Sequence, residues 1–385
     1  MSPVRTRLSE KTADLNLLNR SSNGMKVMTI VGTRPELIRL CLIIEKLDKL
    51  CDQVLVHTGQ NYDVNLNDIF LKQLGYRKMD YYLDAKGSFG EQAGIILSKL
   101  ETIIAKEKPD AFLVLGDTNS SLGAIMAKRL GVRVFHMEAG NRCYDDRVPE
   151  ENNRRIIDSQ SDILLPYSER SRANLIREGI GGERIYVTGN PIKEVLDHYE
   201  SEIDENDIMQ KLGLEKNKFF LMTLHRAENV DSEERLASFV EAFNKTYAKY
   251  KMPMIWSVHP RTKKQLTKHP KLKVSKGITV SEPLGFFEFN NLQKHAFCVL
   301  SDSGTAQEEC SIYGVPTVTL RDVTERPETL EAGSNFISGA EPEDILRGVE
   351  AVTKSENNWM PPKDYLVPNV SDIVARIVLS YWPGS

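Results

Sequence analysis

Two acidic residues in the first half of the chain stand directly after short apolar runs, where they could carry protons. Asp117 follows the run 111–116, and Glu138 follows the run 133–137. Two carboxylates at one rim can be tuned to different pKa values and so serve as acid and base. The alternative for Asp117 is a cap of the next helix, the commoner role of an aspartate at such a position.

A segment dense in charge follows the second of these runs. The stretch 141–155 contains Glu150, Glu151 and Arg154 among other charged residues and leads into a helical segment. A solvated loop that runs into a helix at Pro149 would explain this composition. Its position directly after a candidate active-site strand favours a functional role, and both interpretations stay open.

The first apolar run ends in a turn that suits a phosphate. Gly32 and Thr33 turn the chain, Pro35 suits the first position of a helix, and Arg34 stands beside the helix start. Free N–H groups at a helix start together with an arginine attract phosphates. No complete GxGxxG or Walker pattern is present, so an ordinary strand-to-helix turn is the alternative.

Histidines accompanied by arginines end two apolar runs in the second half of the chain. His225 and Arg226 follow the run 219–224, and His259 stands two residues before Arg261. A lone histidine is more often structural, but a His-Arg pair at the end of two successive strands favours a role in the site. Imidazole can act as acid, base or hydrogen-bond donor near neutral pH, and arginine can bind phosphate. We expect no metal here, because the histidines lack ligand spacing and no HExxH motif occurs.

A small polar turn formed by Ser301, Asp302, Ser303, Gly304 and Thr305 opens a later helix that carries Glu308 and Glu309 one turn in. Small residues let backbone amides approach a diphosphate, and a carboxylate further along the helix can accept hydrogen bonds from ribose hydroxyls. Arg326 in a following loop is a second candidate phosphate contact, and Phe289 could flank a base. The alternatives are a well-capped helix and, for Phe289, core packing.

Parallel strands are the elements that would bring these residues together. From Met25 onward, short branched apolar runs alternate with segments of helical period, which is typical of strands joined by crossover helices. Ligands of such sheets bind at the carboxyl ends of the strands. The predicted strands are 26–32, 53–59, 111–117, 133–140, 162–168, 184–190, 219–226, 254–260, 278–284, 297–304 and 316–322.

The predicted fold class is therefore α/β, with two Rossmann-like, doubly wound domains facing each other across a cleft. We predict a polar extension at 1–24, a first domain at 25–192 that carries the carboxylates, and a second domain at 193–368. A C-terminal helix within 369–385 is expected to pack back across the domains.

The overall composition excludes several classes of protein. Fifty basic and 54 acidic residues give a net charge of −4, too balanced for general nucleic-acid binding. The five cysteines are scattered, without zinc-binding spacing, and indicate reduced thiols in a cytoplasmic protein. A membrane span needs about 18 to 20 consecutive apolar residues, and no run approaches this length. Residues 1–24 lack the apolar core of a signal peptide.

The order of ten short motifs resembles that of the non-hydrolysing UDP-N-acetylglucosamine 2-epimerase family over nearly the whole chain from Met25. The motifs are GTRPE, TGQ, GDTNS, HMEAG, PEENNR, TGNP, HRAEN, HPRT, DSGTAQEE and TERPE. The resemblance implies the GT-B-like domain arrangement of many nucleotide-sugar glycosyltransferases, a UDP-sugar substrate, a homodimer, and neither metal nor redox cofactor.

The resemblance also implies inversion at carbon 2 of the sugar, in which UDP leaves carbon 1 and later returns. Asp117, Glu138 and Glu150 resemble the family's acid-base carboxylates, and His225 resembles its catalytic histidine. Arg154 resembles the arginine that organises the catalytic loop. The residues expected to contact UDP are Arg34, Arg39, Phe289, Ser303, Gly304, Thr305, Glu309 and Arg326.

The chain departs from the family pattern at three places. Arg39 replaces a common lysine, Thr305 replaces a common second glycine, and Asn61 replaces the histidine of members with an activating second UDP-N-acetylglucosamine site. The last departure argues against such activation. The stretches NRCYDDRVPEE, TGQNYD and 284–305 most resemble the branch that makes UDP-N-acetyl-L-fucosamine from its talo isomer for surface polysaccharides.

Three other functions could use the same cleft. A hydrolysing epimerase that releases UDP differs only in how well water is excluded. A GT-B-type UDP-sugar glycosyltransferase needs at most one base in the first domain, against the three carboxylates present. A non-catalytic UDP-sugar sensor would bind the nucleotide without exchange at carbon 2.

Overall fold

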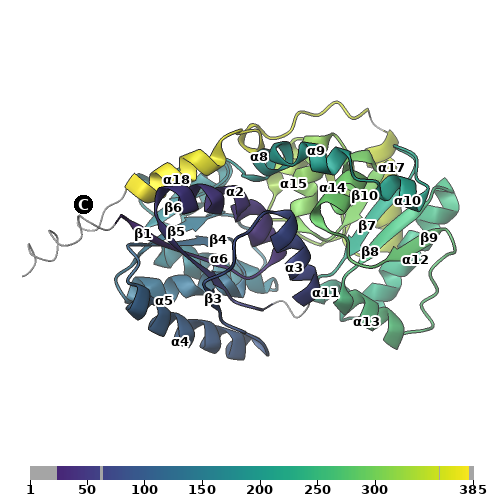
Figure 1. The fold of residues 1–385 in the computed structure, drawn as a ribbon. Coiled ribbons are helices and arrows are strands. Elements are labelled where there is room, and N and C mark those ends of the chain that lie inside the picture. The colour runs from purple at the N-terminus through teal and green to yellow at the C-terminus, as the bar shows by residue number, and fades with distance from the viewer. Residues whose placement is uncertain (1–23, 61–63, 355, 381–385) are drawn as a thin grey trace, which may run out of the picture.

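The computed structural model describes residues 24–60, 64–354 and 356–380. It contains two six-stranded parallel sheets, one in each half of the chain (Figure 1). The predicted extension at 1–24, apart from Gly24, and the predicted departure at Asn61 lie outside the described residues. No helix of the described part has the length and apolar character needed to cross a membrane.

The first sheet has the strand order β3-β2-β1-β4-β5-β6, and all its pairs are parallel. Its strands are β1 Lys26–Val31, β2 Asp52–His57, β3 Tyr81–Tyr82, β4 Ala111–Leu115, β5 Arg133–Met137 and β6 Ile163–Leu165. Its helices are α2 Arg34–Leu50, α3 Val64–Gln73, α4 Phe89–Glu107, η1 Asn119–Leu122, α5 Gly123–Arg129, α6 Pro149–Gln160, α7 Glu169–Arg177 and η2 Gly182–Arg184.

The second sheet repeats this order, since β9-β8-β7-β10-β11-β12 places its first strand, β7, between β8 and β10. Its strands are β7 Phe220–Leu224, β8 Met254–Val258, β9 Ile278–Ser281, β10 Cys298–Ser301, β11 Thr317–Thr319 and β12 Asn335–Ile337. Its helices are α11 Ala227–Val230, α12 Glu233–Tyr250, α13 Pro260–Lys268, α14 Phe286–His295, α15 Gly304–Tyr313, α16 Pro327–Glu331 and α17 Pro342–Lys354.

Short helices connect the two halves and close the chain. They are α8 Ile192–His198, α9 Glu200–Asp204, α10 Ile208–Leu212, η3 Lys363–Tyr365 and α18 Val370–Ser380. The last helix, α18, returns to the first sheet and packs on α2 (Figure 1). Ser371 donates to Glu194, and Asp372 pairs with Lys46, so polar contacts fix the returning helix at its start.

Apolar side chains cover both faces of each sheet. In the first half, α2 and α18 cover one face, and α4 and α5 cover the other (Figure 1). Strands buried on both faces are continuously apolar rather than alternating, which explains why the short apolar runs are recognisable in the sequence. Fully buried residues such as Val27 and Ile30 face these opposite layers.

One predicted strand is wrong, and two strands were not predicted. The segment 184–190 forms only a single bridge, between Ile185 and Leu164, because the chain passes the sheet edge with few hydrogen bonds and turns at Gly189, where φ is +84°. The edge strands β3 and β12 are two and three residues long. Strands this short carry too little periodicity to be recognised.

The strand order decides where a ligand can bind. In each sheet the chain leaves the first strand toward one edge and later returns to its other side, so the helices after β1 and β4, and after β7 and β10, start on either side of a crevice. Arg34 follows β1, Asp117 follows β4, His225 follows β7 and Ser303 follows β10. The candidate residues therefore lie at the switch points of both sheets.

Gly140, just after β5, lies close to the backbone of α7 at Ser171. Its φ is +77°, and a Cβ atom would lie 2.3 Å from the Ser171 carbonyl oxygen. We expect Gly140→Ala to lower the free energy of unfolding by about 3 kcal/mol or more, through backbone strain and the clash. Denaturant unfolding measures the effect.

The matched control is Gly131→Ala. Gly131 has a φ of +78°, but a Cβ atom added there would have no neighbouring atom within 4 Å, so only backbone strain of about 1 kcal/mol is expected. Equal losses in the two variants would show that the contact with Ser171 does not restrict residue 140.

Candidate active site

A pocket lies between the two sheets and is lined from both. Arg34 and Phe70 contribute from the first half, and Arg34 lies over the Phe70 ring, 5.7 Å from its centroid. Of the candidate residues named from the sequence, seven line this pocket: Arg34, His225, His259, Phe289, Ser303, Thr305 and Glu309. The structure thus brings together residues that span most of the chain.

The turn before α15 is shaped for an anionic group. The Ser303 hydroxyl accepts a hydrogen bond from the Thr305 amide at 3.3 Å, which caps the helix start beside the pocket. A Cβ atom on Gly304 would lie 2.7 Å from a carboxylate oxygen of Glu325, so a larger residue there would displace this carboxylate. Helix starts of this kind favour phosphates.

His225 is oriented by Asp302, a buried aspartate of the turn before α15 whose contact with His225 sequence reasoning did not predict. Its Nδ1 lies 3.0 Å from Asp302, whose carboxylate also accepts from the backbone amides of His225 and Arg226 and from the Asn229 side chain. Burial favours the neutral acid, but the charge and hydrogen bond of His225 and the backbone amides hold the pKa of Asp302 below its ordinary value. With Nδ1 held in this way, Nε2 is the nitrogen that can turn to a ligand.

The predicted carboxylates lie near one another. The Asp117 carboxylate is 2.6 Å from Arg154. Burial raises the pKa of Asp117; Arg154 opposes this, while the charges of Glu138, Glu150 and Glu325 add to it, and the pKa stays above its ordinary value. A carboxyl group of this kind can exchange a proton nearer to neutral pH.

Glu138 is in a different environment, in a ring of four charges. Its oxygens lie 2.9 Å from Arg39 and 2.7 Å from Arg326, and the same two arginines bind Glu308. All four side chains are buried, at most 6% exposed. Burial by itself raises the pKa of Glu138. The positive charges of Arg326 and Arg39 lower it by more, so the pKa of Glu138 lies below its ordinary value.

The backbone of Glu138 is also unusual. Its φ is +65°, in the left-handed region that a residue with a side chain rarely adopts. Such strain persists where the surroundings enforce it and is common at functional sites. Neither Arg39 nor Arg326 lines the pocket, and their expected contact with UDP stays a prediction.

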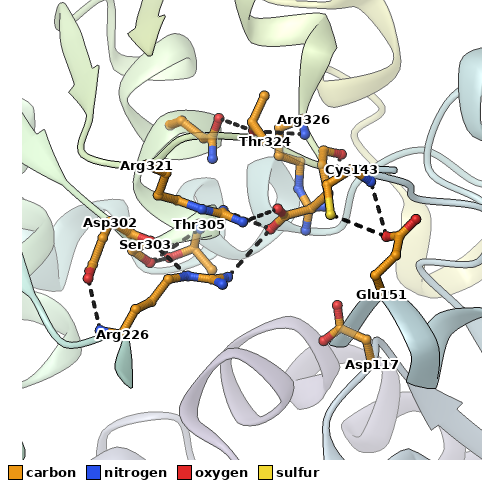
Figure 2. A network of polar contacts seen from close by, with 12 residues as sticks. Asp117, Cys143, Glu151, Arg226, Asp302, Ser303, Thr305, Arg321, Thr324 and Arg326 are labelled. Carbon is orange, nitrogen blue, oxygen red and sulfur yellow. Dashed lines mark hydrogen bonds and ion pairs between the residues drawn. The ribbon is translucent and has the colours of Figure 1, made fainter. Parts of the chain in front are cut away.

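The charged loop before α6 is held by Glu151. This buried carboxylate accepts from the amides of Cys143 and Tyr144, each at 3.1 Å, and from Arg154 at 2.7 Å. Figure 2 shows Asp117 and Glu151 on one side of the network and Arg226, Asp302 and Ser303 on the other. Arg154 thus links the loop to Asp117, while Glu150, at the start of α6, is half-buried.

Sequence reasoning predicted no ion pairs for two buried glutamates of the second half, Glu308 and Glu325. Glu308 belongs to the ring, and Glu325 binds Arg321 at 2.6 Å and lies within 4.0 Å of Arg154 and Arg226. Both stand in motifs that were noticed, but a glutamate in a motif does not by itself reveal an arginine partner from a distant segment. Within the described residues, no group of three or more His, Cys, Asp or Glu could hold a metal ion.

Relatives of this chain carry one recurrent description. The family described as UDP-N-acetylglucosamine 2-epimerase matches residues 45–379. The UDP-N-acetylglucosamine 2-epimerase of Methanocaldococcus jannaschii is 42% identical over 88% of this chain and 95% of its own. The UDP-2,3-diacetamido-2,3-dideoxy-D-glucuronate 2-epimerase of Pseudomonas aeruginosa is 37% identical over 82% of this chain and 89% of its own.

Solved structures agree with the fold. The M. jannaschii UDP-GlcNAc 2-epimerase in complex with UDP-GlcNAc and UDP has a TM-score of 0.88 at 40% identity and covers 93% of this chain and 100% of its own. The Rickettsia bellii UDP-N-acetylglucosamine 2-epimerase has a TM-score of 0.86 at 42% identity, covering 93% and 97%. The predicted α/β fold with two Rossmann-like domains in a GT-B-like arrangement is confirmed. The chain belongs to the UDP-N-acetylglucosamine 2-epimerase family, a family of isomerases.

Proposed function

We propose that this protein is a non-hydrolysing 2-epimerase of UDP-N-acetylhexosamines, with UDP-N-acetylglucosamine as its first candidate substrate. The observation that carries the proposal is the meeting of two groups in one cleft. His225 and Glu309 line a pocket with a phosphate-type helix start, and Asp117 is connected to this pocket through Arg154, Glu325 and Arg226, the neighbour of His225. The family membership and the names of its relatives support the same activity.

The chemistry follows from the weak acidity of the hydrogen on carbon 2. Its removal becomes feasible when the electron pair forms a C1=C2 double bond while the C1–O bond breaks and UDP takes the bonding pair. Cationic and N–H donors stabilise the departing diphosphate. The UDP oxygen then adds back to carbon 1 as a proton reaches carbon 2 from the opposite face, which inverts that centre.

We assign roles as the side chains suggest. Asp117, Glu138 and Glu150 carry protons, and the raised pKa of Asp117 makes it a better base near neutral pH than Glu138. His225, oriented by Asp302, acts near the leaving diphosphate. We assign binding of the two phosphates to a separate set of residues: Arg34, Arg39, Ser303, Gly304, Thr305 and Arg326. Glu309 binds the ribose, and Phe289 lies near the uracil. Arg154 holds the catalytic loop.

The sugar is proposed as a class because a relative from P. aeruginosa is named for a different hexose. The 6-deoxy-L-talo and L-fuco pair is the second substrate to test, on the motifs noted in the sequence. The homodimer and a role in surface polysaccharide synthesis stay predictions. A glycosyltransferase is less favoured, because a set of carboxylates around Asp117 exceeds what transfer requires.

Proton NMR in deuterium oxide tests the proposal. Incubation with UDP-N-acetylglucosamine should introduce deuterium at carbon 2 and produce a manno-type anomeric signal while UDP stays attached. Free UDP with a reducing sugar would instead identify a hydrolysing enzyme. If UDP-N-acetylglucosamine does not react, deuterium incorporation into the UDP-6-deoxy-L-sugars would support the same reaction on a different substrate. No reaction with either sugar would contradict the proposal.

Asp117→Asn tests proton transfer. The amide keeps the size of the side chain but cannot accept the proton, so we expect kcat to fall about 10²- to 10⁴-fold, with the Kd for UDP within about threefold of wild type. Asp146→Asn is the control, since Asp146 is exposed and pairs with Arg155 at the surface. Near-normal turnover in Asp117→Asn would remove Asp117 from the reaction.

The pH dependence of UDP binding tests Glu309. Burial raises the pKa of Glu309 to about 7, against the opposing charge of Arg39. An ionised carboxylate accepts stronger hydrogen bonds from ribose, so binding should tighten as the pH rises through 7. Between pH 6 and pH 8 the Kd should fall by up to about tenfold.

Glu309→Gln is the control for this profile, because its amide does not titrate and the phosphates of UDP titrate alike with both proteins. Its Kd should change less over the same pH range. Parallel profiles for wild type and variant, measured by calorimetry, would show that Glu309 does not contact the ribose as a carboxylate.

A further inference from the structure

Glu36, in the first turn of α2, has a buried carboxylate that the proposed reaction does not use. The residue is 1% exposed. Its Oε2 accepts hydrogen bonds from the amides of Gly32 at 2.5 Å and Thr33 at 3.0 Å. Both amides belong to the turn that follows β1, so this oxygen closes the start of its own helix in the usual manner of an acidic residue at this position.

The other oxygen of Glu36 reaches a different turn. Its Oε1 accepts from the hydroxyls of Ser120, at 2.6 Å, and Thr118. These two residues follow β4, more than 80 positions away in the sequence. Helix capping requires only the first oxygen, so the contact with the second turn needs a separate explanation.

A third turn joins the same cluster. The Gln60 side chain, after β2, donates to the Thr118 hydroxyl at 3.2 Å. A Cβ atom on Gly32 would lie 2.0 Å from the Thr58 hydroxyl, so the turns after β1 and β2 are in direct contact. Glu36 therefore sits where the ends of three neighbouring strands meet.

The chemistry of these neighbours matches a carboxylate. The two amides can only donate hydrogen bonds, the two hydroxyls can donate, and an ionised carboxylate offers about four acceptor positions. Burial of this group has a cost, since it raises the pKa of Glu36 to about 7 despite the hydrogen bonds from Ser120, Thr118 and the two amides. An apolar residue would avoid this cost but would leave the amides and hydroxyls without this acceptor.

The two turns held by Glu36 carry residues of the site. Arg34 lies between Thr33 and Glu36 and lines the pocket. Asp117 directly precedes Thr118 and binds Arg154. We propose that Glu36 is a positioning residue whose carboxylate fixes the turn of Arg34 relative to the turn of Asp117. This role rests on the proposed function, because it assigns those turns to diphosphate binding and proton transfer.

The test is a double-mutant cycle on kcat. One arm is Glu36→Gln, and the other is Thr118→Val with Ser120→Ala, which removes the two hydroxyls that bind Oε1 and, at Thr118, also the acceptor of Gln60. The hydroxyl variant leaves the amides of Gly32 and Thr33 on Glu36, so kcat should fall about tenfold or more while the Kd for UDP changes less than about twofold. Glu36→Ala, which frees both turns, should lower kcat further and weaken UDP as well.

Glu36→Gln should partly restore turnover relative to Glu36→Ala, because its carbonyl can accept from the amides and its NH2 can donate to hydroxyls that turn around. Combined with the hydroxyl substitutions, it should lower kcat less than the product of the separate effects, since all of them act through one contact. Glu45→Gln, on the exposed face of the same helix, is the matched control and should leave kcat unchanged.

Three results would overturn the role of Glu36. The first is that the effects of Glu36→Gln and of the hydroxyl substitutions on kcat multiply, as for independent sites. The second is that the variants lose thermal stability while kcat and KM stay unchanged. The third is that Glu36→Ala and Glu36→Gln have equal turnover. The wild-type protein is assayed beside them on both UDP-sugar pairs. Inactivity of the wild type on both would instead contradict the proposed function, and the role of Glu36 with it.

Discussion

Two buried arginines and two buried glutamates form a closed ring of ion pairs that joins the two halves of the chain. Arg39 and Glu138 come from the first half of the chain, and Glu308 and Arg326 come from the second. Each charge has two partners of opposite sign, so the ring is neutral as a whole. Loss of one member would leave an uncompensated charge in a buried place, which is strongly destabilising.

Buried carboxylates are also paired with arginines in the rest of the site. Arg154 faces Asp117 and Glu151, and Glu325 lies among Arg321, Arg154 and Arg226. Because the balance of burial, like charge and arginine contact differs at each position, the pKa of Asp117 is raised while that of Glu138 is lowered. The carboxyl groups of Asp117 and Glu138 therefore differ in their affinity for a proton and suit different roles in acid-base chemistry.

Buried acidic residues also position groups that face the pocket. Asp302 holds His225 by one ring nitrogen, Glu151 holds the charged loop by two amides, and Glu36 joins the turns after β1 and β4. In each case the carboxylate also accepts hydrogen bonds from backbone amides of the segment that it holds. Turns at the ends of parallel strands have amides outside the regular ladders that need acceptors, which explains why acidic residues recur there.

The pattern of apolar residues along the chain is enough to predict the two sheets and the strand ends that carry the site. Strands buried on both faces must be continuously apolar, and the polar residues that end them, such as Asp117 and His225, stand out against that background. Which strand ends are neighbours and which charges pair follows from the folded arrangement of the strands and domains. Arg39 and Glu308 are 269 positions apart, and Asp302 is 77 positions from His225. Local patterns report the period and burial of one segment, whereas an ion pair between segments depends on strand order and domain packing, so the partners of Glu308 and Asp302 could be recognised only once the chain had folded.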